Sequence, residues 1–455
     1  MPLIIGANSV SGGYEVDNSL RFNSGSSDYL ARTPSSTTNQ QIFTFSTWFK
    51  FSDVSATYNN IASFGASSVT NGVCYIDINS SKQLEIFMRA SGTEYKSITT
   101  QLFRDVSAWY HIIIAVDTTQ ATSTNRTKVY VNGSQVTSFS TQNAVPQNTN
   151  LLVNTSSSEN RIGASRDSGS TLGSYFNGYQ SEVNLIDGQQ LTPSSFGETD
   201  QDTNIWIPKA YTGSFGTNGF YLEFQNSGAL GTDSSGNGNT FTVNNLTSID
   251  QTTDTPTNNF ATLNPLDAGG GGSYAEGNLQ FTSATSDLKA SASSFALNNG
   301  NAGKWYWEVK MVSTTGSIYQ IGTISSTSSY IAQPYSQYAS GGQVYVNGSQ
   351  ITTVATYTTN DIISVAFDAT ISEVKYFKNG SLVTTQTITN SNNILMFAGS
   401  HSDSSGNTAT YQFNFGNPPF TISSGNADAD GFGNFEYAVP SGYFALCTKN
   451  LSEYA

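Results

Sequence analysis

Charged residues are scarce in this chain of 455 residues, at 11% of the total, whereas an average globular protein has roughly 25%. Helices take their exposed faces largely from Glu, Lys and Arg, so this scarcity argues against a helix-rich protein. Cysteine is almost absent as well: Cys74 and Cys447 form no C-x-x-C pair, which excludes the common zinc and redox motifs. No apolar run approaches the roughly 20 residues that a membrane-spanning helix needs.

Positive charge is the scarcer sign, with 18 Lys and Arg against 32 Asp and Glu, a net charge of −14. Phosphate backbones and anionic lipids repel such a chain, so we exclude nucleic acid and membrane insertion. Residues 1–10 have neither the basic start nor the cleavage site of a signal peptide. We therefore expect the protein to be made in the cytoplasm of its cell of origin and to leave it without a signal peptide.

The chain does contain many aromatic residues, 12% of the total, and a repeated hairpin pattern. Residues 112–136 and 362–383 each contain an apolar strand that ends in an acid, a polar connection, and a second strand that runs into Asn-Gly. Asn132-Gly133 and Asn379-Gly380 supply the positive φ angles of a type I′ turn. Two such copies predict two related β-sandwiches on one chain.

Short alternating segments predict strands along the whole chain. In residues 43–51, FTFSTWFKF, the phenylalanines occupy every second position except one, as in a strand with one buried face. Similar segments separated by turn residues indicate an all-β protein. We divide the chain into an N-terminal docking arm (1–19), a first sandwich (20–245), a Pro- and Gly-rich linker (246–278) and a second sandwich (279–455).

Each sandwich resembles a known family. WYHIIIAVD (109–117), KVYVNGSQV (128–136) and YFNGYQSEVNLIDGQQLTPSSF (175–196) resemble the laminin-G-like, concanavalin A-like lectin superfamily. GKWYWEVK (303–310), DIISVAFD (361–368) and FNFGNPPF (413–420) resemble the SPRY family, and GYFALCTKNL (442–451) looks like its closing strand. The resemblance implies two concanavalin A-like antiparallel sandwiches (jelly rolls) that bind ligands.

Residues 205–266 resemble sequence from tailed-bacteriophage genomes. That resemblance implies a structural protein on the virion surface, most simply a tail fibre or receptor-binding component. Its expected partners are other virion proteins, a host cell-surface glycan and further copies of itself, with a trimer as our expectation. The alternatives are a capsid (head) decoration protein without a specific receptor and a polysaccharide depolymerase.

Residues with the spacing that catalysis needs are not evident. The chain has two histidines, His111 inside a predicted strand and His401 in a turn, and no G-x-S-x-G elbow to pair with either. Glycoside hydrolysis needs two neighbouring carboxylates. Glu182 and Asp187 are five positions apart and so are predicted on opposite faces of one strand. We therefore predict no enzymatic activity and no catalytic residue.

Ligand-binding candidates are few. Asp233–Asn239 and Asp428–Gly431 are oxygen-rich turns that could suit calcium, but we assign no ligand set, no metal and no cofactor. Tyrosines in loops can stack on sugar rings, and residues 328–342 form the richest such loop. Tyr330, Tyr335 and Tyr338 in that loop are our predicted carbohydrate-binding residues.

Overall fold

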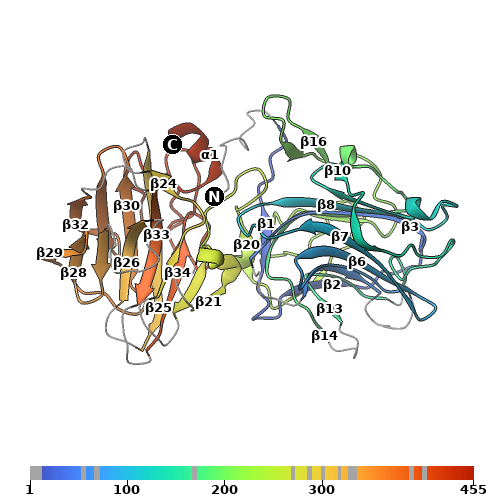
Figure 1. The fold of residues 1–455 in the computed structure, drawn as a ribbon, viewed down its shortest axis with the longest axis horizontal. Coiled ribbons are helices and arrows are strands. Elements are labelled where there is room, and N and C mark those ends of the chain that lie inside the picture. Colours follow the sequence, from blue (N-terminus) through green and yellow to red (C-terminus); the bar gives the residue numbers. More distant parts are fainter. Residues whose placement is uncertain are drawn as a thin grey trace. The chain divides into compact units, whose positions relative to one another are not determined.

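The computed structural model describes residues 13–52, 58–65, 72–156, 158–166, 172–267, 272–283, 289–298, 303–315, 319–325, 336–388, 394–401 and 407–455. Its contacts divide the chain into two compact units, one ending at Thr257 and the other beginning at Asn258. Each unit is built from antiparallel sheets, which confirms the all-β prediction (Figure 1). Among the described residues, no helix is long and apolar enough to cross a membrane.

The first unit is a sandwich of two large sheets, which we call sheets A and B. Sheet A contains, in order of pairing, β10 (Ser134–Gln135), β9 (Thr127–Val131), β8 (Tyr110–Asp117), β3 (Ile42–Phe51), β15 (Gly178–Asp187), β1 (Ser19–Phe22) and β20 (Gln251–Thr252), with β18 (Phe220–Leu222) also on β15. Sheet B contains β11 (Phe139–Gln142), β7 (Thr93–Leu102), β6 (Gln83–Ala90), β5 (Cys74–Asn79), β4 (Tyr58–Phe64), β12 (Asn160–Ile162), β2 (Tyr29–Arg32) and β19 (Thr242–Asn244).

Alternation along the strands builds the core between these sheets. Phe45 and Phe49 of β3 pack in one buried cluster with Ile76 of β5 and Ile86 of β6, so residues from both sheets meet there. The even-numbered residues of β3 point to the other face of sheet A, and they are buried too. Segments outside the sandwich must therefore cover sheet A, and this cover includes the hairpin β16 (Gly197–Thr199)–β17 (Trp206–Pro208), whose Trp206 packs beside Trp48. A second short hairpin, β13 (Ser165–Arg166)–β14 (Leu172–Gly173), lies outside the two large sheets.

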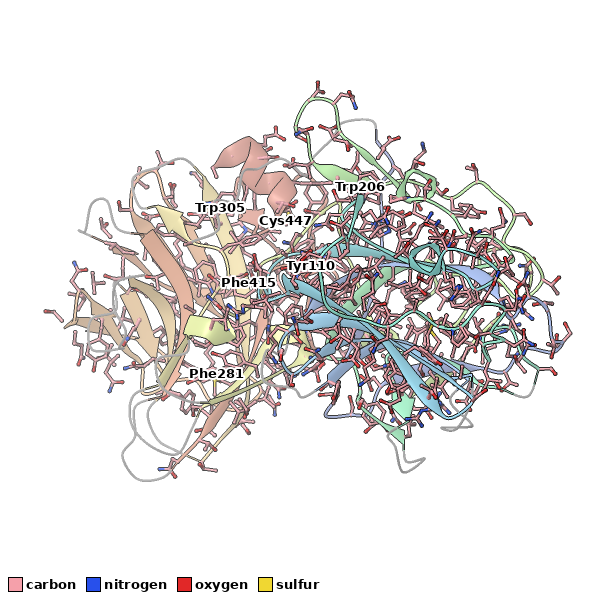
Figure 2. The ribbon with its side chains drawn as sticks, turned by 45° about the vertical axis from the view of Figure 1, so that its right-hand side comes forward. Tyr110, Trp206, Phe281, Trp305, Phe415 and Cys447 are labelled. Atoms are coloured by element: carbon pink, nitrogen blue, oxygen red, sulfur yellow. The ribbon has the colours of Figure 1, made fainter. Side chains whose placement is uncertain are left out.

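The second unit is also a two-sheet sandwich. One sheet contains β21 (Gly272–Ala275), β22 (Gln280–Ser283), β34 (Ala409–Asn414), β25 (Lys304–Thr314), β30 (Ile362–Asp368), β31 (Glu373–Lys378) and β32 (Ser381–Thr387), with β35 (Phe444–Ala445) also on β25. The other contains β23 (Lys289–Ala292), β33 (Ile394–His401), β26 (Tyr319–Ser325), β27 (Ser336–Ala339), β28 (Gln343–Val346) and β29 (Ser349–Thr353), with β24 (Leu297–Asn298) on β33. Trp305 and Phe415, labelled in Figure 2, are fully buried in its core.

In the parts of the chain that the structure describes, helical structure is confined to short turns and one terminal helix. The described 3₁₀ turns and the helix are η1 (Ser123–Asn125), η2 (Pro193–Ser195), η3 (Ser248–Asp250), η4 (Pro265–Asp267), η5 (Glu276–Asn278) and α1 (Thr448–Tyr454). The expected closing strand at 442–451 is therefore only the two residues of β35, and the chain then turns into α1. The sequence Thr-Lys-Asn-Leu-Ser-Glu-Tyr lacks the period-2 apolar pattern that would have continued a strand.

The predicted linker packs against the two units instead of separating them. In its first part, β20 pairs with β1 and Asp254 is fully buried. In its second part, Phe260 forms a bridge with Cys447 and β21 pairs with β22. The boundary between units therefore falls inside the range 246–278, and the residues on either side of it complete the two sandwiches. The composition of this segment predicted a linker, although Phe260 and Leu263 within it are buried.

The Asn-Gly pairs at the two predicted turns adopt the predicted conformation, and so does the pair Asn347-Gly348 of the second unit. Asn132, Asn347 and Asn379 have φ angles of 45°, 49° and 48°, and each glycine that follows has a φ of 78°. These values match the left-handed conformation of a type I′ hairpin turn. The identical sequence VYVNGSQ thus forms the same local turn in both units.

The surroundings of these turns differ, and this allows a matched test. A Cβ added to Gly133 would lie 2.4 Å from Cε3 of Trp206, whereas a Cβ at Gly348 would meet nothing within 4 Å. We expect Gly348→Ala to lower the free energy of unfolding of its unit by about 1–2 kcal/mol, because alanine is strained at positive φ. Gly133→Ala should lose more than this, since Trp206 must also move. Denaturant unfolding, followed separately for each unit, measures the loss of free energy of unfolding in each variant. Equal losses for Gly348→Ala and Gly133→Ala would show that the contact with Trp206 is unimportant.

Candidate functional site

The outer face of sheet A holds a buried ion pair. Lys50 in β3 and Asp254 in the segment after β20 are both almost completely buried, and the ammonium contacts the Asp254 carboxylate. Trp109 Nε1 donates a second hydrogen bond to Asp254, at 3.1 Å, and the ammonium lies 5.0 Å from the centre of the Tyr179 ring. Burial lowers the pKa of Lys50 from its ordinary value, while Asp254 opposes that change. Every partner is satisfied within the unit, so this pair is structural.

His111 on the neighbouring strand β8 is also structural. Its ring stacks on Trp48, with centroids 4.7 Å apart, and Trp206 Nε1 donates to His111 Nδ1 at 2.9 Å. The Nε2–H is thus left to donate to Ser46 Oγ, 2.8 Å away. Burial lowers the pKa of His111 to about 3, so the ring is neutral and cannot supply a proton at ordinary pH. This agrees with the structural role that its place in a strand predicted.

Glu182 is the acid on this face whose pKa is shifted most. It lies in a β-bulge of β15 with a φ of 52°, which is unusual for a residue other than glycine. Tyr221 Oη donates to Glu182 Oε1 at 2.6 Å, and Tyr14 Oη donates to Oε2 at 3.0 Å. Burial raises the pKa of Glu182 to about 7, and Glu223 adds to that increase. Because both oxygens are engaged by phenols, the carboxylate fastens chain segments together and is not poised to react.

The described part of the predicted N-terminal arm lies on its own unit. Besides Tyr14, Val16 exchanges two hydrogen bonds with Thr257 Oγ1, at 3.1 Å each, and Ser181 Oγ donates to the carbonyl of Asn18. Residues 14–18 are therefore part of the cover of sheet A. Residues 1–12, where an arm could reach a partner, lie outside the described residues.

The second unit uses a buried acid in the same way. Glu308 in β25 is fully buried and accepts hydrogen bonds from the backbone N–H groups of Glu436 and Tyr437, at 2.9 and 2.8 Å. Tyr306 Oη and Asn414 Nδ2 each donate to it at 3.1 Å. Burial raises the pKa of Glu308. Four donors around one carboxylate fix the segment before β35 and leave no oxygen for a substrate.

The two oxygen-rich turns are closed by their own hydrogen bonds. Asp233 accepts from the backbone N–H groups of Tyr221, Ser235 and Asn239, and Asp428 accepts from those of Asp430, Phe432 and Ala445. A calcium ion at either turn would have to displace these donors. In the described part of the chain, no three His, Cys, Asp or Glu side chains converge on one point.

The predicted tyrosine loop needs a correction at Tyr338. This residue lies in β27, which pairs with β26 and β28, and its side chain is fully buried. Its ring packs against Tyr357 and Tyr376, with centroids 4.8 and 5.8 Å away, and its hydroxyl contacts the carbonyl of Ala355. Tyr338 is thus a core residue and cannot stack on a sugar. Tyr330 and Tyr335 lie outside the described residues.

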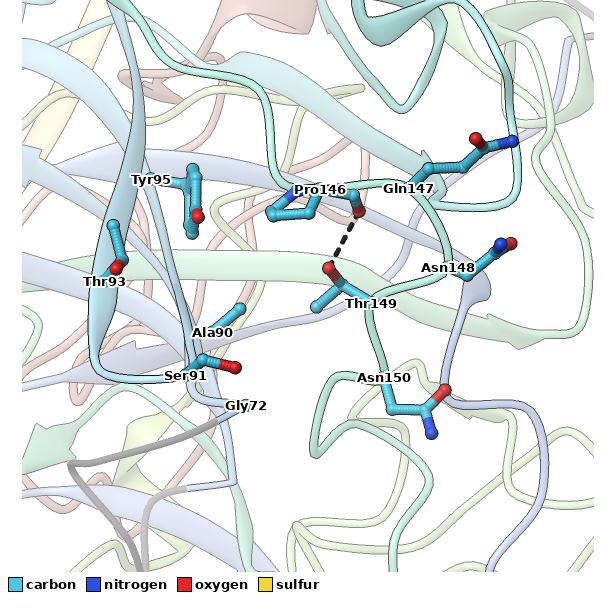
Figure 3. Close-up of a pocket in the computed structure, with 10 residues that line it drawn as sticks. All are labelled: Gly72, Ala90, Ser91, Thr93, Tyr95, Pro146, Gln147, Asn148, Thr149 and Asn150. Atoms are coloured by element: carbon cyan, nitrogen blue, oxygen red, sulfur yellow. Dashed lines mark hydrogen bonds between the residues drawn. The ribbon is translucent and has the colours of Figure 1, made fainter.

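A polar pocket in the first unit is a better candidate. Its volume is about 390 Å³, and it lies between the turn that joins β6 to β7 and the loop 146–150 (Figure 3). The residues that line it share small or polar side chains, with one tyrosine. They are Gly72, Ala90, Ser91, Thr93, Tyr95, Pro146, Gln147, Asn148, Thr149 and Asn150.

The pocket walls are held by hydrogen bonds that leave other polar groups available. Thr149 Oγ1 donates to the Pro146 carbonyl at 2.8 Å, as Figure 3 shows, and Gln147 Nε2 donates to the Thr119 carbonyl. The backbone N–H of Asn148 donates to the Thr118 carbonyl, while its φ of 59° turns the chain. Tyr95 is half-buried and packs against the core. A fixed ring beside solvent-facing hydroxyls and amides can bind a neutral, hydroxyl-rich molecule.

Sequence reasoning missed this pocket. Thr93 and Tyr95 lie in β7, TEYKSITTQL, whose mixture of charged and hydroxyl residues does not show a clear apolar alternation. Pro146 to Asn150 form an ordinary polar loop in the sequence. Only the fold brings the two segments together, across roughly 50 residues of chain that separate them.

Comparisons with known proteins agree with a lectin-like fold in the first unit. A family model, Laminin_G_3, described as the concanavalin A-like lectin/glucanases superfamily, matches residues 24–195, which include most of sheets A and B and the whole pocket. No curated protein matches the chain.

Several solved structures are distantly similar. The SPRY domain of human HERC1 is 16% identical, with a TM-score of 0.30 over 33% of this chain and 96% of that chain. Another human SPRY domain is 16% identical, with a TM-score of 0.25 over 30% and 90%. A heptameric SAP-like pentraxin from Limulus polyphemus is 17% identical, with a TM-score of 0.27 over 39% and 78%. Likenesses this distant carry no inference about ligands.

The position of Glu182 predicts a pH dependence of stability. Its folded-state pKa of about 7 lies above the value of roughly 4.3 for an unfolded chain, so the folded protein holds this proton more tightly. The associated stability is present below about pH 4 and is lost as pH rises through 7. Between pH 5 and pH 8 we expect the free energy of unfolding of the wild type to fall by up to about 3 kcal/mol more than that of Glu182→Gln.

Urea unfolding of the first unit at both pH values measures this difference. Glu198→Gln is the control, because Glu198 is exposed in the same unit and pairs only with Lys209 on the surface. Tyr14, Tyr221 and Glu223 are the titratable groups that face Glu182. Parallel pH profiles for wild type and Glu182→Gln would contradict the prediction.

Proposed function

We propose that this protein is a non-enzymatic carbohydrate-binding protein, and that its ligand binds in the pocket between the β6–β7 turn and the loop 146–150. A lectin-like fold suggests binding of carbohydrate or protein. The composition of the pocket favours carbohydrate, since hydroxyl, amide and tyrosine side chains recognise the hydroxyls and ring faces of sugars, and none of the described residues that line it is charged.

The polar groups in the pocket carry this proposal. Ser91, Thr93 and Tyr95 are at or beside the β6–β7 turn, and their hydroxyls have no hydrogen-bond partner described within the protein. Asn148 belongs to the loop that forms the other wall. A volume of about 390 Å³ is within the usual range of small-ligand pockets and suits one or two sugar units.

The wider setting rests on the resemblance of residues 205–266 to phage sequences. We propose that the protein lies on the surface of a tailed-phage virion, in a tail fibre or receptor-binding component. There the pocket would bind a glycan of the host cell surface, and several copies would act together in a homo-oligomer. Multiple copies raise the avidity of a weak sugar site without any new contact.

Binding of the full chain to an array of bacterial polysaccharides and oligosaccharides tests the proposal. For a sugar that binds, Thr93→Val and Tyr95→Phe each remove one hydroxyl with little change in shape. Each should weaken binding about 2- to 10-fold, the effect of losing one hydrogen bond. Asn148→Gly removes the amide without backbone strain, because φ is already positive there, and should weaken binding by a similar factor.

The control is Thr385→Val, a matched replacement at an exposed position of β32 in the second unit. It should leave the affinity unchanged. Equal affinity for wild type and all three pocket variants would place the sugar site elsewhere. No binding to any glycan on the array, together with binding to a purified protein, would favour a protein partner.

A further inference from the structure

Several buried polar atoms on the outer face of sheet B have no hydrogen-bond partner. In β5, Cys74, Ile76 and Ile78 point into the core, so Asp77 points to the opposite face. The sheet register pairs Asp77 with Asn60 of β4 on one side and with Glu85 of β6 on the other. Residues directly opposite in a sheet have Cβ atoms roughly 5 Å apart. Asn60, Asp77 and Glu85 thus form one row across three strands.

The row is buried and has unused oxygen atoms. Asn60 is 0% exposed, Asp77 2% and Glu85 5%. Both side-chain atoms of Asn60, Oδ1 and Nδ2, and Oδ1 of Asp77 have no hydrogen-bond partner in the protein. Buried polar atoms nearly always have a partner, so these atoms point to a bound species that belongs to the folded state.

The charges in the row indicate what that species is. Lys96 Nζ lies 3.1 Å from Glu85 Oε1, and it is also 3.8 Å from Glu94. The charge of Lys96 also acts on Asp77, although no described ion pair joins the two, so one ammonium faces three carboxylates. An isolated buried carboxylate is costly unless it is neutralised. A cation neutralises the charge and also uses the Asn60 carbonyl oxygen.

We propose that Asp77, Asn60 and Glu85 bind a calcium ion on the outer face of sheet B, a site distinct from the carbohydrate pocket. Calcium accepts carboxylate and amide oxygens in irregular arrangements and completes its shell with water, whereas magnesium demands a near-ideal octahedron. Asn79 Nδ2 donates a hydrogen bond to Glu85 Oε2 at 3.4 Å and so restrains that carboxylate.

Terbium provides the test, because it replaces calcium and emits when a nearby tyrosine is excited. Tyr75 is two residues from Asp77 on the same face of β5, and its ring is fixed by stacking on Phe87 at 4.2 Å. The full chain, first treated with a chelator, should give saturable terbium emission that added calcium displaces. Calcium should also raise the melting temperature of the first unit.

Two variants locate the site. Asp77→Asn should weaken calcium binding at least tenfold, and Asn60→Asp, which adds a carboxylate oxygen, should tighten it, an effect that misfolding cannot imitate. Asp202→Asn, in an exposed turn of the same unit, is the control and should change nothing.

Three results would overturn the proposal: no saturable emission from wild type, emission unaffected by Asp77→Asn, or binding not tightened by Asn60→Asp. Suppose that Asp77→Asn stabilises the chelator-treated protein and that added calcium changes the stability of neither form. That result would show that Asp77 is protonated and that only water fills the row. None of these results bears on sugar binding in the pocket, so the two proposals fail independently.

Discussion

The burial of central strands on both faces is the constraint on which the rest of this structure depends. An antiparallel sandwich normally leaves one face of each sheet to water, but in β3, β15 and β30 the residues of both faces are buried. The outer faces still carry polar residues, because strict alternation places every second side chain there. Each of those residues must find a partner in the segments that cover the sheet, or leave a buried charge unsatisfied.

This constraint explains why long stretches without regular structure are well packed. Asp254 lies beside Lys50, Tyr14 beside Glu182, and the backbone of residues 436–437 beside Glu308. The pairs attach the segments at the start and end of the first unit, and the segment before β35 in the second unit, to their sheets. The shifted pKa values of the buried acids and of His111 result from this packing. Functional sites are therefore to be sought where buried polar groups lack hydrogen-bond partners, or where the segments that cover the sheets end.

The sequence was sufficient for much of the fold. Alternating phenylalanines located β3, and Asn132-Gly133 and Asn379-Gly380 located two hairpins with the turn type they adopt, because both signals are local. It was insufficient for β7, whose outward side chains are charged, and for the segment 246–278, whose buried residues are paired only by distant strands. Tyr338 was misplaced for a related reason: a Ser- and Gly-rich neighbourhood resembles a loop, while strand pairing with β26 and β28 buries the residue. The pocket and the row at Asp77 both depend on register between strands, which no local pattern contains.

The central claim is that the first unit binds a carbohydrate between the β6–β7 turn and the loop 146–150. The most direct measurement is a crystal structure of the full chain with the oligosaccharide that binds it most tightly. The account predicts a sugar ring beside Tyr95, with hydrogen bonds to Thr93 and Asn148. A sugar bound only on the second unit, or on another face of the first, would contradict it.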